Sequence, residues 1–262
     1  MDKRPGVIYS PEDGPFVASF RMTSEENRAT ARSWHPVQIA RIERLLDLFH
    51  EFIGAHFRTF ELTRPTPDAC ERLLFSVAHK NQIALLAILE NILIGLHGAV
   101  RPLFRQVFEA QLLAKFVSSR TDLGLAEQWA RGQQIAIGRS ILRELPDRLA
   151  EPIGRLYTIT HKYVHATTSS QQVSLHAEDN AERTSHDLTV LGLLLHSQRH
   201  FLFRHAFSRA TAKCANRYAH YANGLSLVAV RNETRTLLAA DLIEQSAEAR
   251  AFIRAYRSNW AL

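Results

Sequence analysis

The chain has 262 residues, 46% of them hydrophobic and 22% charged, and its 32 Lys+Arg against 26 Asp+Glu give a net charge of +6. This balance is typical of a globular protein with a sizeable core and excludes a disordered chain, while two cysteines, Cys70 and Cys214, are too few for a disulfide framework or a four-cysteine zinc site. The longest apolar run, residues 83–89, is far shorter than the roughly 20 residues that cross a bilayer, and the first residues lack the apolar stretch of a signal peptide, so we expect a soluble cytoplasmic protein without membrane contact.

The first 35 residues are the least regular part of the chain. Prolines and a glycine interrupt them, and residues 17–20 are compatible with a short extended piece. We therefore expect residues 1–35 to form an arm over a single all-α domain of residues 36–262. Beyond the arm, apolar side chains recur every three or four positions, which predicts an amphipathic helix over about 37–62.

The next helix is predicted to be the central one. The sequence Thr-Pro-Asp at 66–68 is typical of a helix start, because threonine can cap a free amide, proline fits the first position and aspartate meets the positive end of the helix dipole. The helix is expected to run to about Gly95 or Gly98. Residues 83–89 are apolar on every side of it, so we expect these residues to be buried: Leu85, Leu86, Ile88 and Leu89.

Prolines and capping residues delimit the helices of the remaining chain. Pro102 and Pro152 are expected at the first position of their helices, and Thr121 or Asp122, and later Asn232, as caps. The polar stretch 167–185 is expected to be a long mobile loop. Because every long apolar segment has helical spacing, we predict an all-α bundle of about six or seven helices around one core. The helices of this part are predicted over about 102–119, 121–145, 152–165, 186–223 and 232–257.

The first group of candidate functional residues lies at the helix that Pro102 opens. Arg101, Arg105 and Glu109 are four positions apart and share one stripe of a helix. Two interpretations stay open. One is a structural Arg–Glu pair that holds neighbouring helices together, and the other is a substrate site in which Glu109 orients an arginine toward a phosphate or a carboxylate.

The second group lies in residues 155–165. His161 and His165 are one helical turn apart, a spacing at which two imidazoles can bind a metal or share proton transfer. Tyr157 lies on the same face of this helix. The alternative interpretation is a helix that packs one polar edge at the rim of the bundle.

The third group, residues 196–205, contains another pair of histidines one turn apart, His196 and His200. Two such pairs would supply four imidazoles to one zinc ion. Neither pair has a carboxylate at a matching step, however, and Arg199 would repel a cation, so we predict no metal and no cofactor. Cys70, near a helix start, is expected to be a small buried side chain rather than a nucleophile.

Two stretches give the chain a family resemblance: Arg-Pro-Leu-Phe-Arg-Gln-Val-Phe-Glu at 101–109, which follows an apolar helix, and Tyr-Thr-Ile-Thr-His-Lys-Tyr-Val-His at 157–165. In this order they resemble a group of uncharacterised bacterial helical proteins known only as a domain of unknown function. The resemblance covers about residues 70–170 and implies no established activity.

A more distant resemblance is to the helical bundles of the HEPN superfamily, many of which are metal-independent ribonucleases with an Arg-x(4–6)-His motif at a dimer interface. Arg155 and His161 fit this motif, although four other Arg/His pairs of the chain have an allowed spacing, and Leu156 stands where active members commonly have a polar residue. The resemblance implies that His161 is the acid or base and that Arg155 stabilises the phosphate. The complete set of candidates is Arg155, Tyr157, His161 and His165 as catalytic residues and Arg101, Arg105 and Glu109 as substrate contacts.

Two functions from different classes are consistent with these observations. The first is a homodimeric interaction module, and the alternative is a HEPN-like metal-independent ribonuclease of the toxin or phage-defence type. Six helical steps turn Arg155 and His161 about 240° apart, so they would converge only across a two-fold dimer. Arginine supplies 27 of the 32 cationic residues, which suits phosphate contacts and makes RNA the partner of the alternative. Aromatic residues that look exposed also favour a homodimer: Phe201, Phe203 and Phe207.

Overall fold

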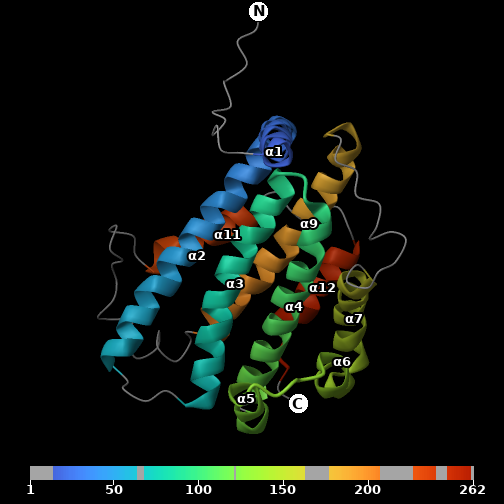
Figure 1. Ribbon diagram of the computed structural model, residues 1–262. Helices are drawn as coiled ribbons and strands as arrows, with labels where there is room; N and C mark the ends of the chain where they lie inside the picture. The colour runs from blue at the N-terminus through green and yellow to red at the C-terminus, as the bar shows by residue number, and fades with distance from the viewer. Residues whose placement is uncertain are drawn as a thin grey trace, which may run out of the picture.

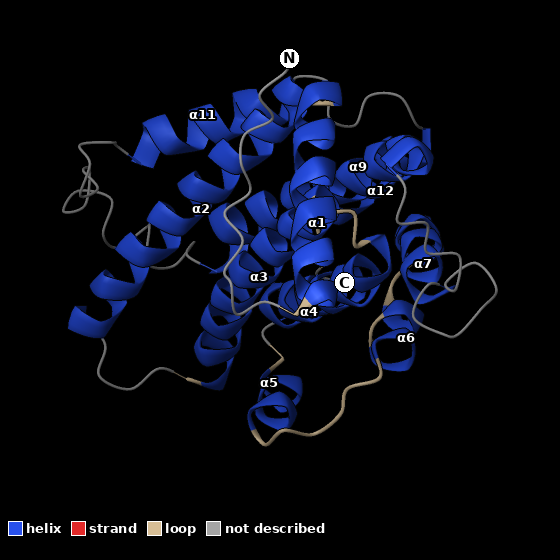
Figure 2. Cartoon of the chain, turned by 45° about the horizontal axis from the view of Figure 1, so that its top comes forward, coloured by secondary structure: helices blue, strands red, loops and turns tan. Residues whose placement is uncertain are grey.

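The computed structural model describes residues 14–63, 68–120, 122–162, 177–206, 227–239 and 247–260, without the side chains of 57–63, 139, 159–162, 177–180, 227, 228 and 239. Every regular element within these ranges is helical, which confirms the all-α prediction (Figure 2). In chain order the elements are α1 (Pro15–Trp34), α2 (Pro36–Thr63), α3 (Ala69–Leu93), α4 (His97–Arg120), α5 (Leu123–Ala130), α6 (Ile137–Ser140), the 3-10 turn η1 (Leu142–Glu144), α7 (Asp147–Lys162), α9 (Ala177–Phe201), the π-helical turn η2 (Leu202–Ala206), α11 (Leu227–Ala239) and α12 (Ala247–Arg257).

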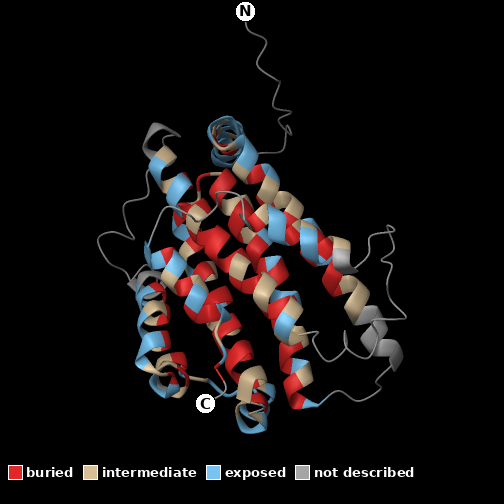
Figure 3. Ribbon diagram, turned by 180° about the vertical axis from the view of Figure 1, so that it is seen from behind, coloured by how far each residue is buried: buried red, intermediate tan, exposed pale blue. Residues whose placement is uncertain are grey.

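The antiparallel pair α3 and α4 lies at the centre of the bundle, and α9 packs against both (Figure 1). On one side α2 packs against α11, and on the other α7 packs against α12. The short helices α5 and α6 lie at the end where α4 finishes, and α1 lies at the opposite end, near the turn from α3 to α4. Buried residues therefore gather in the middle of the bundle (Figure 3), where apolar side chains of the described helices form one core cluster.

The start of α3 differs from the prediction by two residues, because Asp68 rather than Thr66 is the cap. Its Oδ1 accepts a hydrogen bond from the amide of Glu71 at 2.7 Å, and the Glu71 carboxylate accepts one from the amide of Asp68 at 3.2 Å. This reciprocal pair satisfies two amides that a helix start leaves without a partner. At the other end Gly95, with a φ of +81°, lets the chain turn from α3 into α4. Thr66 lies outside the described residues.

The prediction of a buried central helix is confirmed for Leu85, Ile88 and Leu89 but is wrong for Leu86, which is 49% exposed. Ile83, one turn earlier, is 59% exposed. Neighbouring helices cover α3 on most sides and leave this stripe open. By length and composition α3 also qualifies as a membrane span, but more than half of its most apolar stretch is buried in the bundle, as in the core helix of a globular protein.

Residues 15–34 form α1, so the expectation of an irregular arm with an extended piece at 17–20 is wrong for this part. Asn27 donates a hydrogen bond from its side chain to the carbonyl of Ile94 at 3.1 Å and ties α1 to the end of α3. Apolar side chains such as Phe16, 80% exposed, point away from the bundle. The usual apolar stripe therefore gives no signal of this helix. The buried side chains of α1 are Ser24, Asn27 and Ala31.

Pro102 and Pro152 lie inside their helices rather than at the first position. Because α4 begins at His97 and α7 at Asp147, each proline is the sixth residue of its helix. A proline ring crowds the carbonyl of the residue four positions earlier and removes one amide donor. Here that carbonyl belongs to the second residue of the helix, so the lost bond falls in the first turn and the helix continues beyond it.

The segment after α4 is also divided differently from the prediction. Asp122 caps α5 by accepting a hydrogen bond from the amide of Leu125 at 3.0 Å. The helix then ends at Ala130 instead of continuing to residue 145. Gly132, with a φ of +72°, turns the chain toward α6 and η1.

Two predictions for the C-terminal half need correction. Residues 177–185, expected in a loop, are the start of α9, while 163–176 lie outside the described residues. The helix expected over 232–257 is two helices, and Asn232 lies within α11 rather than at its start. The loop and the helix were predicted from the polarity of the sequence. Polarity alone does not distinguish an exposed helix from a loop.

Candidate functional site

Two of the predicted groups meet between α4 and α7. Arg105 donates from Nε to Glu109 at 2.8 Å, and the Tyr157 hydroxyl is hydrogen-bonded to both side chains. The hydrogen bond that Arg105 donates to Glu109 raises the pKa of Arg105. Burial, followed by the charge of Glu109, raises the pKa of Tyr157. A surface hollow of about 410 Å³ lies beside Arg105 and Glu109 and includes Trp129 in its wall. Arg105, Glu109 and Tyr157 satisfy one another's hydrogen-bonding groups. This is the structural role expected of an Arg–Glu pair that holds neighbouring helices together.

The other catalytic candidates do not join this cluster. Arg155 is exposed and pairs with Glu151, one turn earlier on α7, at 2.6 Å. The backbone of His161 belongs to α7, but its side chain is not described, and His165 lies outside the described residues. The catalytic roles of Arg155, Tyr157, His161 and His165 therefore stay predictions.

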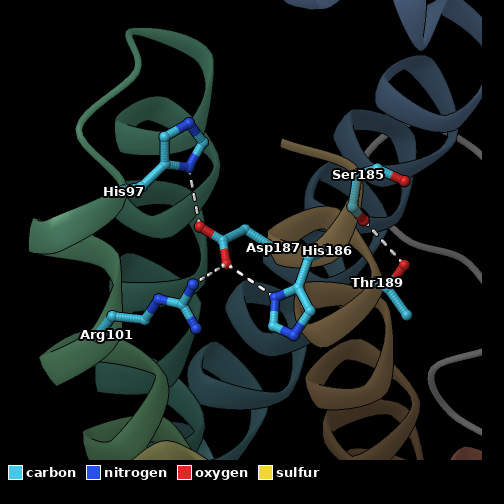
Figure 4. Close-up of polar contacts among 6 residues, drawn as sticks. All are labelled: His97, Arg101, Ser185, His186, Asp187 and Thr189. Atoms are coloured by element: carbon cyan, nitrogen blue, oxygen red, sulfur yellow. Dashed lines mark hydrogen bonds and ion pairs between the residues drawn. The ribbon is translucent and has the colours of Figure 1, made fainter. Parts of the chain in front are cut away.

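Arg101 separates from its predicted partners and binds a buried carboxylate on α9 (Figure 4). Asp187, with no exposed area, lies 2.9 Å from His97 Nδ1 through Oδ2. Its Oδ1 lies 3.1 Å from Arg101 Nη2 and 3.3 Å from His186 Nδ1. One carboxylate thus holds two side chains of α4 and its own neighbour on α9.

This network keeps Asp187 ionised inside the bundle. Burial by itself would raise the pKa of Asp187, but hydrogen bonds from His186 and His97 and the charge of Arg101 together lower it below its ordinary value. The carboxylate accepts from His97 Nδ1, which leaves Nε2 of that ring buried and without a partner among the described side chains. Sequence reasoning missed the network because His97 and Asp187 are 90 positions apart.

The histidines of the third predicted group lie in separate environments. His196 contacts α11, whereas His205 lies 2.7 Å from the Ser118 hydroxyl. The His200 ring lies beside that of His205, with ring centroids 5.3 Å apart and the planes tilted by 56°. Burial and nearby cations lower the pKa of His196 and of His205 to about 4. Within the part of the chain that the structure describes, no group of three or more His, Cys, Asp or Glu side chains has an arrangement that could hold a metal ion. The aromatic residues expected at a dimer interface are not exposed where the structure describes them. Phe201 is fully buried and Phe203 packs on the core, while Phe207 lies outside the described residues.

A cluster of five arginines lies around His196, where α9, η2, α11 and α12 meet. We call it the arginine patch and define it as Arg199, Arg204, Arg231, Arg235 and Arg257. Arg199 is half-buried and the others are exposed. Burial, followed by the charges of the four other arginines, lowers the pKa of Arg199 to about 10. The four guanidinium groups therefore lie within electrostatic reach of Arg199.

Two arginines of the patch, Arg199 and Arg257, are held in place by neutral acceptors. Arg199 donates from Nε to the Thr234 hydroxyl at 3.0 Å and from Nη2 to the carbonyl of Arg231 at 3.0 Å. Arg257 donates from Nη2 to His196 Nδ1 at 3.4 Å. Among the described residues no carboxylate pairs with any arginine of the patch.

Several arginines elsewhere in the described structure differ from those of the patch, because each is paired with a carboxylate. On α1, Arg28 pairs with Glu90 at 2.8 Å and Arg32 with Glu43 at 2.5 Å. Four further pairs follow the same rule: Arg44–Glu233, Arg105–Glu109, Arg120–Glu144 and Arg155–Glu151. The patch is therefore a local excess of positive charge, in contrast to these paired arginines of the described structure.

A sequence signal for the patch exists, although it is not a block of like charges. The 45 residues from 188 to 232 contain no Asp or Glu, and six cationic residues occur among them. Three of these cations belong to the patch, whereas Arg235 and Arg257 come from later in the chain. The absence of acidic residues from 188–232 indicates a positively charged segment. Only the fold brings α12, with Arg257, beside this segment.

Comparison with known proteins adds no functional assignment to this geometry. The family resemblances therefore stay predictions. The chain matches no family model, no curated protein and no solved structure.

Proposed function

We propose that the protein is a binding module that holds the phosphate backbone of RNA at the arginine patch. The observation that carries the proposal is the set of five neighbouring guanidinium groups, none of which has a carboxylate partner in the described structure. Two of them, those of Arg199 and Arg257, are held by neutral acceptors. Gathering like charges is unfavourable unless an anion offsets the repulsion. Arginine is suited to that anion, because its planar fork can donate two hydrogen bonds to one phosphate.

A chain of phosphates fits the patch better than one small anion. The five arginines come from four elements, and four of them are exposed, so their charge is spread over a surface rather than focused in a closed cavity. Contacts of this kind position a nucleic acid without reading its bases. We therefore expect binding with little sequence preference and a strong dependence on salt.

The test compares two double variants that remove the same charge. Binding of a fluorescent single-stranded RNA is measured by anisotropy for the wild type, for Arg231→Gln/Arg235→Gln in the patch, and for Arg28→Gln/Arg32→Gln on α1. Loss of two phosphate contacts should weaken binding about tenfold near physiological salt. The α1 variant should bind like the wild type, because its arginines are already paired with carboxylates.

Competition separates a nucleic-acid backbone from other polyanions. DNA of the same sequence should compete, because it offers the same phosphodiester groups. Equal weakening by both double variants would mean that net charge alone drives binding and would contradict the proposal. Anionic lipid vesicles that bind more tightly than either nucleic acid would contradict it as well.

This proposal specifies the interaction module expected from the sequence. The homodimer, the cytoplasmic location and ribonuclease chemistry at Arg155 and His161 stay predictions.

A further inference from the structure

His196, on α9, contacts both α11 and α12 through its ring. Its Nε2 lies 3.2 Å from the carbonyl of Leu238, and its Nδ1 lies 3.4 Å from Arg257 Nη2. A carbonyl only accepts hydrogen bonds, so Nε2 carries the proton. Nδ1 is then left with a lone pair, which matches a guanidinium that only donates.

The ring is neutral at ordinary pH. Burial, followed by the charge of Arg257, lowers the pKa of His196 to about 4, and Arg199 adds to this effect. A neutral acceptor fixes the direction of a guanidinium without cancelling its charge. The opposite case is present on the same helix α11, where Glu233 binds Arg44 at 2.7 Å and neutralises it.

We propose that His196 is a positioning residue for the arginine patch. Its ring holds Arg257 in place for a phosphate contact, and the carbonyl of Leu238 fixes the tautomer of the His196 ring. The inference rests on the proposed function, because the phosphate is that of the bound RNA. The competing explanation is purely structural: the ring would only tie α9 to α11 through the Leu238 carbonyl.

Two amide substitutions separate these roles. In His196→Asn the side-chain oxygen lies near the position of Nδ1 and can accept from Arg257, but the bond to Leu238 is lost. In His196→Gln the side-chain nitrogen lies near the position of Nε2 and can donate to Leu238, but the acceptor for Arg257 is lost.

The expected pattern is opposite for affinity and stability. His196→Gln should weaken RNA binding about three- to tenfold, as Arg257→Gln does, and should leave the melting temperature close to that of the wild type. His196→Asn should melt earlier and bind RNA nearly as well as the wild type. Because both variants act on one contact, adding His196→Gln to Arg257→Gln should cause no further loss of affinity.

Each other outcome overturns a defined statement. If His196→Asn loses affinity while His196→Gln keeps it, the ring is structural and the inference is wrong. If Arg257→Gln binds like the wild type, Arg257 makes no phosphate contact and the inference is wrong, although RNA binding by the other arginines stands. If the wild type binds no RNA, the proposed function and the inference both fail.

Discussion

Asp187 and Lys115 have no exposed area, but their surroundings differ. Asp187 is surrounded by His97, Arg101 and His186, so its charge is paired. Lys115 donates to the carbonyl of Ser258 at 3.1 Å and lies over the rings of Tyr256 and Trp260. Those partners offer partial charges only, and burial lowers the pKa of Lys115 to about 7. A paired charge and a suppressed charge are the two ways in which an ionisable group can be buried.

Removing the charge of Asp187 should destabilise the fold strongly. Asp187→Asn removes the buried negative charge that pairs with the largely buried Arg101 guanidinium, so we expect the free energy of unfolding to fall by about 3–5 kcal/mol. Urea denaturation measures it. Glu151→Gln, which breaks the exposed pair with Arg155, is the matched control and should have a much smaller effect. Equal losses in the two variants would contradict the assignment of Asp187 as the charged centre of the network.

Lys115 predicts a particular pH dependence of stability. Its pKa is about 7 in the folded chain, whereas the ordinary pKa of a lysine, expected in the unfolded chain, is 10.5. Between these values the unfolded chain binds a proton that the folded chain does not. The free energy of unfolding should therefore rise with pH by about 1.4 kcal/mol per unit across this window and lose this contribution as pH falls toward 7. Denaturation at pH 7.5 and 9 tests the slope, and Lys115→Met should lack it. A slope that persists in the variant would assign the effect to other groups.

At the scale of single elements, hydrophobic spacing predicts helices better than it predicts which face they bury. The helix expected over 37–62 is α2, because its apolar residues mark one clear stripe. α1 was missed because the side that it buries is polar. Leu86 was misplaced because α3 is apolar on all sides, and only the arrangement of its neighbours leaves one stripe exposed.

The exposed stripe of α3 gives a sharp comparison between adjacent leucines. Leu85→Ala removes a fully buried side chain and should lower the free energy of unfolding by about 2–5 kcal/mol. Leu86→Ala acts on a half-exposed side chain and should cost well under half as much. Both are read from chemical denaturation. A Leu86→Ala variant as unstable as Leu85→Ala would indicate that another chain covers this stripe in solution.

For the candidate sites, sequence spacing reached the contacts within one helix and missed those between helices. Arg105 and Glu109 are one turn apart, so their pairing follows from the spacing alone. Tyr157 contacts this pair because α4 packs against α7. Arg101 pairs with Asp187 because α4 also packs against α9. The arginine patch depends on four elements, and its members span positions 199 to 257.

At the scale of the whole molecule, the net positive charge is modest, but it is distributed unevenly over the structure. The net charge of +6 would be weak if it were spread evenly. Carboxylates instead pair with arginines on α1, α2, α4 and α7, and the stretch 188–232 has none. The excess is left where α9, α11 and α12 meet, which is a surface that attracts polyanions.

The salt dependence of RNA binding tests this account most directly, because it counts the phosphate contacts. If the five arginines of the patch each meet a phosphate, the logarithm of the affinity for single-stranded RNA should fall with the logarithm of salt concentration with a slope of about −3.5. In Arg231→Gln/Arg235→Gln the slope should flatten to about −2.1, whereas Arg28→Gln/Arg32→Gln should keep the wild-type value. A wild-type slope near zero, or the same slope in both double variants, would contradict RNA binding at the arginine patch.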